Sequence, residues 1–105
     1  LAYKGDVRDL RDSPAMVLHN MLKREGIKTY VYEPYFNDAE LVKMGFMPCN
    51  PEEEGCDVVI IGCDHSQFKN FDYRKIPGLK FIVDGKNILQ KLHVPVIGIG
   101  TGTKV

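Results

Sequence analysis

Polar side chains that could hold a ligand recur where the chain leaves apolar, strand-like runs. They supply a phenol, cations, carboxylates and an imidazole, which together can hydrogen-bond to a charged small molecule. In an open parallel sheet such a molecule binds beyond the carboxyl ends of the strands. We therefore expect one shared edge to carry Tyr3 and Lys4, Glu33, Asp64 and His65, and Asp84 to Asn87.

Positive and negative charges balance, with 14 Lys and Arg against 14 Asp and Glu in 105 residues. A neutral chain has no overall field to attract nucleic acid or an anionic membrane, and we expect neither as a partner. An anion site must therefore be local. No apolar run reaches the roughly 18 residues that span a bilayer, and we expect a cytoplasmic protein. Because the chain starts at Leu1 without an initiator Met, we expect a piece of a longer protein.

Three cysteines, Cys49, Cys56 and Cys63, follow one another at intervals of seven residues. Their odd number argues against a disulfide framework, and the absence of a C-x-x-C pair argues against zinc. No neighbouring pattern of basic residues would lower a thiol pKa. We expect Cys56 and Cys63, which flank a strand-like run, to be buried thiols in a reducing compartment, and we expect no catalytic role and no metal site for any of the three.

The first predicted helix begins at Pro14, with Ser13 as its N-cap, and ends before Gly26. His19 is expected on its polar face, in solvent. The expected apolar face carries Val17, Leu18, Met21 and Leu22.

Four apolar runs predict strands: "IKTYVYEP", "CDVVIIGCD", "LKFIVDG" and "VPVIGIG". Short helices are expected in "NDAELVKMG" and "KNILQKLH", and a polar loop in "NPEEEG". This alternation predicts an α/β protein with a mainly parallel sheet. We expect Glu33 and Asp84 to brace loops. The glycines of "GIGTGT" lack the G-x-G-x-x-G spacing, and we expect a flexible strand exit there.

Three segments resemble the C-terminal domain of nucleotide-sugar 6-dehydrogenases. "LAYK" followed by "DLRDSP" is similar to the family's "GLxYK…DDxRESP". "CDVVIIGCDHSQFKNFD" resembles its strand followed by an acid and an aromatic residue, and "FIVDGKNIL" resembles its "DGR" strand end. The resemblance covers essentially the whole chain.

The resemblance implies that residues 1–105 form a UDP-binding domain with a Rossmann-like three-layer sandwich. The parent enzyme would use NAD, bound mostly by an absent N-terminal domain, in a two-step, four-electron oxidation. The family keeps its catalytic cysteine upstream, so we expect no catalytic residue here and no turnover by this chain alone. "DHSQFK" and the Lys after Asp-Gly are most similar to the branch that oxidises UDP-N-acetyl-D-mannosamine to its uronic acid for polysaccharide biosynthesis; UDP-glucose 6-dehydrogenase is the alternative.

Site residues follow from the same resemblance. Tyr3 and Lys4 match an aromatic-Lys pair that contacts the nucleotide sugar, and Lys86 matches a substrate-contacting Arg. Arg11 matches an Arg that reaches the NAD side of the cleft. Lys86 departs from the family's pattern, because an ammonium group is a point charge without the bidentate fork of a guanidinium.

The resemblance also implies that the first, central strand of the sheet is truncated at Leu1. Either Leu1 to Tyr3 suffices, or another segment fills the gap, which would allow strand-mediated self-association. The parent is expected to be a homo-oligomer. Two other classes remain open: a stand-alone Rossmann-like binding module, and a non-catalytic assembly domain of the dehydrogenase.

Overall fold

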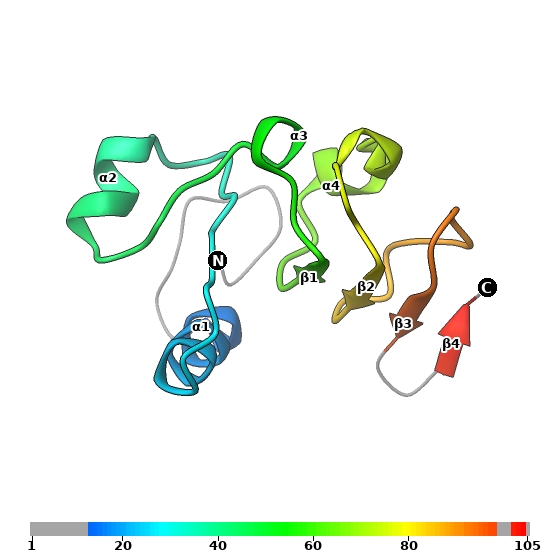
Figure 1. Cartoon of the computed structure of the whole chain (residues 1–105), viewed down its shortest axis with the longest axis horizontal. Helices are drawn as coiled ribbons and strands as arrows, with labels where there is room; N and C mark the ends of the chain where they lie inside the picture. Colours follow the sequence, from blue (N-terminus) through cyan, green and yellow to red (C-terminus); the bar gives the residue numbers. More distant parts are fainter. Residues whose placement is uncertain (1–12, 99–101, 105) are drawn as a thin grey trace.

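The computed structural model describes residues 13–98 and 102–104. Within them, the helical elements are α1 Pro14–Arg24, α2 Asp38–Lys43, α3 Pro51–Glu54, α4 Ser66–Asn70 and the 3-10 turn η1 Tyr73–Lys75. The strands are β1 Val58–Ile61, β2 Phe81–Asp84, β3 Val96–Gly98 and β4 Gly102–Lys104. Helices α1 to α3 precede the first strand, a helix and a 3-10 turn separate β1 from β2, and β3 and β4 follow (Figure 1).

The strands form one sheet in the order β1-β2-β3-β4. β1, β2 and β3 run parallel, with Ile60 beside Val83 and Val83 beside Ile97. These strands are continuous apolar runs, and the predicted α/β class with a mainly parallel sheet is confirmed. The expected flexible exit after β3 is wrong at Gly102–Lys104, which returns antiparallel to β3 as β4. The predicted truncated strand lies in residues 1–12, outside the described residues.

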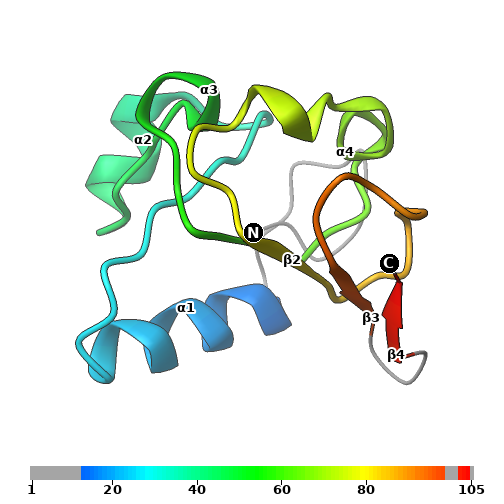
Figure 2. The ribbon, with the colours of Figure 1, turned by 45° about the vertical axis from the view of Figure 1, so that its right-hand side comes forward.

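Helices lie on both sides of the sheet. Figure 2 shows α1 on one side and α2, α3 and α4 on the other. The main core is on the second side, where Ile61, Ile82 and Val96 of the strands pack with Tyr73 and Leu89. This arrangement is the three layers expected of a Rossmann-like fold.

α1 has the predicted ends but not the predicted face. Pro14 is its first residue, and Gly26 follows its end with φ 77°, a conformation that glycine adopts without strain. His19 is only 7% exposed and meets the Phe46 ring edge-on, with ring centroids 4.7 Å apart, so the expectation of a solvated imidazole is wrong. The inward stripe is Ala15, Leu18, His19 and Leu22, whereas Val17 and Met21 are exposed.

Residues 27–33 do not form the predicted strand. Val31 makes an isolated parallel bridge to Pro48: its amide donates to Met47 O at 2.9 Å, and its carbonyl accepts from the Cys49 amide at 3.0 Å. Between this segment, α1 and the outer edge of β1 lies a mainly apolar groove of about 500 Å³. The segment therefore pairs with residues 47–49 and lies apart from the described sheet.

Local hydrogen bonds explain the remaining differences. The Asn50 side chain accepts from the Glu52 amide at 3.1 Å, and this cap turns the expected "NPEEEG" loop into α3. The predicted helix in "KNILQKLH" is wrong, because Asn87 takes φ 54° and interrupts helical backbone at once. The predicted helix in "NDAELVKMG" is confirmed as α2, with a capping box between Asn37 and Glu40.

Candidate functional site

The carboxyl ends of β1 and β2 meet at one edge of the sheet, as the sequence predicts. Ile61 and Asp84 are register partners, and the Gly85 amide donates to Ile61 O at 3.1 Å. A Cβ on Gly85 would lie 2.8 Å from that oxygen, so the close approach of the two strand ends requires glycine. This contact fixes where the turn after β2 begins.

Asp84 holds that turn from inside. Its side chain is fully buried, and its two carboxylate oxygens accept from the Lys86 amide at 3.2 Å and the Leu89 amide at 2.8 Å. The expectation that Asp84 braces a loop is confirmed. Lys86 itself is exposed, so its backbone is anchored while its ammonium group extends into solvent. A lysine fixed in this way can bind a phosphate group as a point charge.

A second carboxylate braces the neighbouring strand end. Nε2 of His65 lies 2.7 Å from Oε1 and 3.0 Å from Oε2 of Glu33, and both side chains are fully buried. The rings of Tyr35 and Phe68 lie 4.6 Å and 5.3 Å from the imidazole, centroid to centroid. The pair therefore positions the turn after β1, and the expected brace role of Glu33 is confirmed.

Aromatic rings beside this pair were not among the predicted site residues. Tyr32 is 40% exposed and Tyr35 is 37% exposed. The Tyr32 hydroxyl accepts a hydrogen bond from Nε2 of the Gln67 side chain at 3.4 Å. Partly exposed rings offer flat faces on which a planar base can stack. The only sequence signal for them is the aromatic content of "TYVYEPYF".

Tyr73 of η1 stabilises α4 through a side-chain hydrogen bond. Tyr73 is 5% exposed, and its hydroxyl donates to Phe68 O at 2.6 Å. Burial first, and then the negative charge of Asp84, raise the pKa of Tyr73 above its ordinary value. The phenol therefore stays protonated and keeps the hydrogen bond that holds the end of α4.

The three thiols do not provide a nucleophile. All are free, and burial raises the pKa of each, that of Cys49 to about 11. A thiol reacts as its thiolate, so these residues are poorly reactive near neutral pH. Among the described residues, no group of three His, Cys, Asp or Glu side chains could hold a metal ion.

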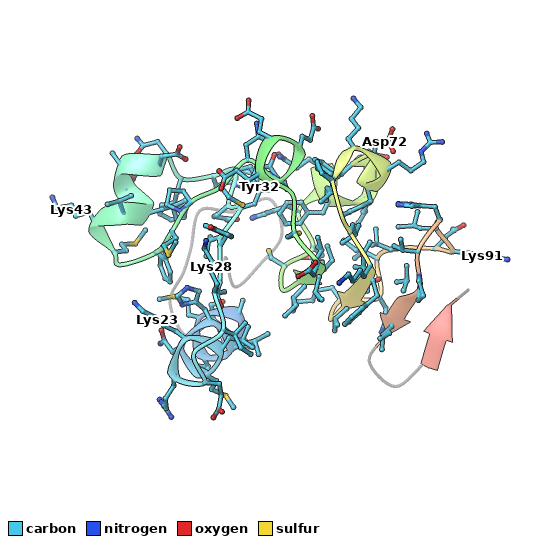
Figure 3. The ribbon with its side chains drawn as sticks, viewed as in Figure 1. Lys23, Lys28, Tyr32, Lys43, Asp72 and Lys91 are labelled. Carbon is cyan, nitrogen blue, oxygen red and sulfur yellow. The ribbon has the colours of Figure 1, made fainter. Side chains whose placement is uncertain are left out.

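Charge on the surface is dispersed. Figure 3 shows Lys43 and Lys91 at opposite ends of the molecule and Lys23 on α1. No helix in the described part of the chain is long and apolar enough to cross a bilayer. The structure thus brings Lys86 and Asp84 together at the predicted edge, whereas Tyr3, Lys4 and Arg11 lie outside the described residues.

Comparison with known proteins gives one family. Residues 1–91 match the family described as "UDP-glucose/GDP-mannose dehydrogenase family, UDP binding domain". No solved structure matches the chain.

Curated relatives agree with this family. The chain is 33% identical to a UDP-N-acetyl-D-mannosamine dehydrogenase of Methanococcus aeolicus over 95% of the chain and 25% of the relative. It is 34% identical to one from Methanocaldococcus jannaschii, over 87% of the chain and 22% of the relative. A UDP-glucose 6-dehydrogenase of Pseudomonas aeruginosa is 27% identical, over 93% of the chain and 24% of the relative. The chain thus spans about a quarter of the length of these proteins.

Proposed function

Because the chain belongs to the UDP-glucose/GDP-mannose dehydrogenase family and carries its UDP-binding domain, we propose that it binds the nucleotide sugar in a longer NAD-dependent 6-dehydrogenase. We propose UDP-N-acetyl-D-mannosamine as the substrate, since dehydrogenases of that name are 33% and 34% identical to the chain and the UDP-glucose enzyme 27%. The cytoplasmic location and homo-oligomeric parent stay predictions.

The anchored Lys86 carries this proposal. Its amide is fixed by Asp84 at 3.2 Å, at the sheet edge where parallel folds bind ligands. A diphosphate carries about two negative charges at neutral pH and binds fixed cations. We propose that Lys86 contacts the diphosphate together with Lys4 and Tyr3, and that Arg11 faces the NAD side of the cleft.

The described residues do not form a site of the kind that binds NAD. A dinucleotide site needs a glycine-rich turn that leads from a strand into a helix, whose N-terminus binds the pyrophosphate. Here β3 is followed by the antiparallel strand β4, with Gly98 beside Gly102. NAD would therefore be held mainly by other parts of the enzyme, and no chemical step is assigned to residues of this chain.

Calorimetric titration of UDP into the full-length protein tests the role of Lys86. We expect Lys86→Ala to weaken binding by about tenfold or more, since a charge-assisted hydrogen bond contributes about 1.5–3 kcal/mol. Lys80→Ala is the matched control, because Lys80 precedes β2 at the opposite edge and pairs with exposed Asp57 at 3.6 Å. Equal affinities of the two variants would remove Lys86 from the site.

The substrate is tested separately with both UDP-sugars. We expect the full-length protein to reduce NAD with UDP-N-acetyl-D-mannosamine and to show a much lower kcat/KM with UDP-glucose. The reverse order would identify a UDP-glucose 6-dehydrogenase. Failure of the full-length protein to bind UDP at all would favour an assembly domain.

A further inference from the structure

One face of the parallel sheet is buried and the other is partly exposed. Ile82 and Val96 are fully buried on the side that carries the main core. On the opposite side, Ile60 is 40% exposed and Ile97 is 38% exposed. Strand register places Val83 between these two isoleucines, so the three side chains form one row across β1, β2 and β3.

On β1, β2 and β3 this partly exposed side is apolar, and at its margin Thr103 of β4 is the register partner of Ile97. Next to the row lies a second register pair, Val58 and Phe81. A sheet with one face in water carries polar residues on that face, whereas strands covered on both sides are continuous apolar runs. The five side chains Val58, Ile60, Phe81, Val83 and Ile97, here called the open face, therefore have the composition of a covered surface.

α1 covers only one end of this side. A Cβ on Gly62, which continues the alternation of Ile60, would lie 2.7 Å from Cβ of Ala15. α1 thus contacts the sheet closely just beyond β1, yet Ile60 and Ile97 keep their exposure. Among the described residues, α1 is the helix on this side of the sheet, and the side chains of β2 and β3 there are left partly exposed.

We propose that the open face is covered, in the full-length protein, by an amphipathic α-helix from outside these 105 residues. Helices are the elements that cover parallel sheets. The open face carries no charge, so the side of the helix that meets it must be uncharged and apolar, since an unpaired charge there would be desolvated. This inference does not depend on the ligand and extends beyond the proposed function.

A second copy of the chain fits the open face less well. Interfaces between separate molecules bury roughly 800 Å² on each partner, far more than five partly exposed side chains can offer. A helix tethered in the same chain needs no such area, because its local concentration is high. The relatives supply ample chain, since the matched region covers only 22% to 25% of three of them.

The test uses photo-crosslinking in the full-length protein. Ile97→Met places photo-methionine on the open face with little change in volume, and cross-linked peptides are mapped by mass spectrometry. Val42→Met is the matched control, because Val42 is 60% exposed on α2, on the other side of the sheet. We expect position 97 to cross-link within its own chain to one helix outside residues 1–105, at apolar positions three or four apart, and position 42 to give no such cross-link.

Carbene footprinting of the unmodified full-length protein provides a second measurement that needs no variant. We expect labelling of Ile97 to be at least about tenfold lower than that of Val42, since a covered side chain is labelled only when the helix opens. Equal labelling of the two residues would overturn the proposal. So would cross-links from position 97 to a second copy or to a non-helical segment, or the absence of any cross-link there.

Discussion

Glu33 clamps Nε2 of His65 between its two carboxylate oxygens, at 2.7 Å and 3.0 Å. The contact joins the end of the 27–33 segment to the turn after β1, although 32 residues separate the two side chains. Within that segment, Val31 makes its backbone bridge to Pro48 and not to β1. The buried pair is therefore a direct side-chain link between this segment and the turn that follows β1.

Removing the carboxylate of this pair is expected to destabilise the fold strongly. Glu33→Ala removes the carboxylate that contacts Nε2 of the fully buried His65 imidazole, and removing one partner of a buried hydrogen bond costs about 1–3 kcal/mol. Urea unfolding measures the loss. The double variant Glu33→Ala/His65→Ala should lose less than the sum of the two single variants, because the orphaned partner is gone.

An exposed ion pair is the control for that experiment. Asp57 and Lys80 lie 3.6 Å apart with side chains that are 76% and 72% exposed, and Asp57→Ala should leave the unfolding midpoint unchanged. If Glu33→Ala behaved like Asp57→Ala, the pair would not be a structural brace.

Local sequence signals predicted the elements but not this contact. Continuous apolar runs identified β1, β2 and β3, and Ser13-Pro14 with Gly26 identified the ends of α1. The contact between Glu33 and His65 leaves no local pattern, because only the assembled fold brings the two residues together. A local sequence pattern can locate the ends of strands, but it does not show which side chains at those ends contact one another.

Errors in the prediction also have physical causes. His19 was placed in solvent by its polarity, but the helix turns the stripe of Ala15, Leu18 and Leu22 inward, and the imidazole lies in the same stripe. The helix expected in residues 86–93 fails because the Asp84 carboxylate accepts the Lys86 and Leu89 amides, which favours a turn. The candidate site was predicted as an edge, with Glu33 and Asp84 as loop braces, but the groups to which these two carboxylates bind were not predicted.

Gly62 should be intolerant of a side chain. Gly62→Ala would place its Cβ 2.7 Å from Cβ of Ala15, and overpacking of this kind costs about 1–3 kcal/mol. The change in unfolding free energy gives the cost. Adding Ala15→Gly removes the clashing methyl group, so the double variant should recover part of the loss beyond additivity. Purely additive effects would show that α1 does not dock at this point.

The Cys49 thiol should titrate late. Burial first, and then the charge of Glu54, raise its pKa from 9.0 to about 11. Alkylation by iodoacetamide should therefore reach half its maximal rate near pH 11 in the folded chain and near pH 9 after unfolding.

The same shift links Cys49 to stability. The folded state holds the thiol proton more tightly than the unfolded state, so the contribution is complete below pH 9 and is lost as the pH rises towards 11. Cys49→Ala should flatten the fall in stability across this range. An identical pH profile for the variant and the parent would contradict the assignment.

Asp84 should act on the ligand through Lys86. Asp84→Asn keeps the size of the side chain but replaces one acceptor oxygen with an NH2 group, so either the Lys86 or the Leu89 amide loses its partner. Leaving a buried amide unsatisfied costs about 1–3 kcal/mol of stability. Because the turn then no longer fixes Lys86, the affinity for UDP should fall as well.

The double variant tests this route. In the Lys86→Ala background, Asp84→Asn should still lower stability but should leave the affinity for UDP unchanged. Asp57→Asn, at an exposed acid that precedes β1 at the opposite edge of the sheet, is the control and should change neither quantity. A further loss of affinity in the Lys86→Ala background would mean that Asp84 influences the ligand by a route other than the position of Lys86.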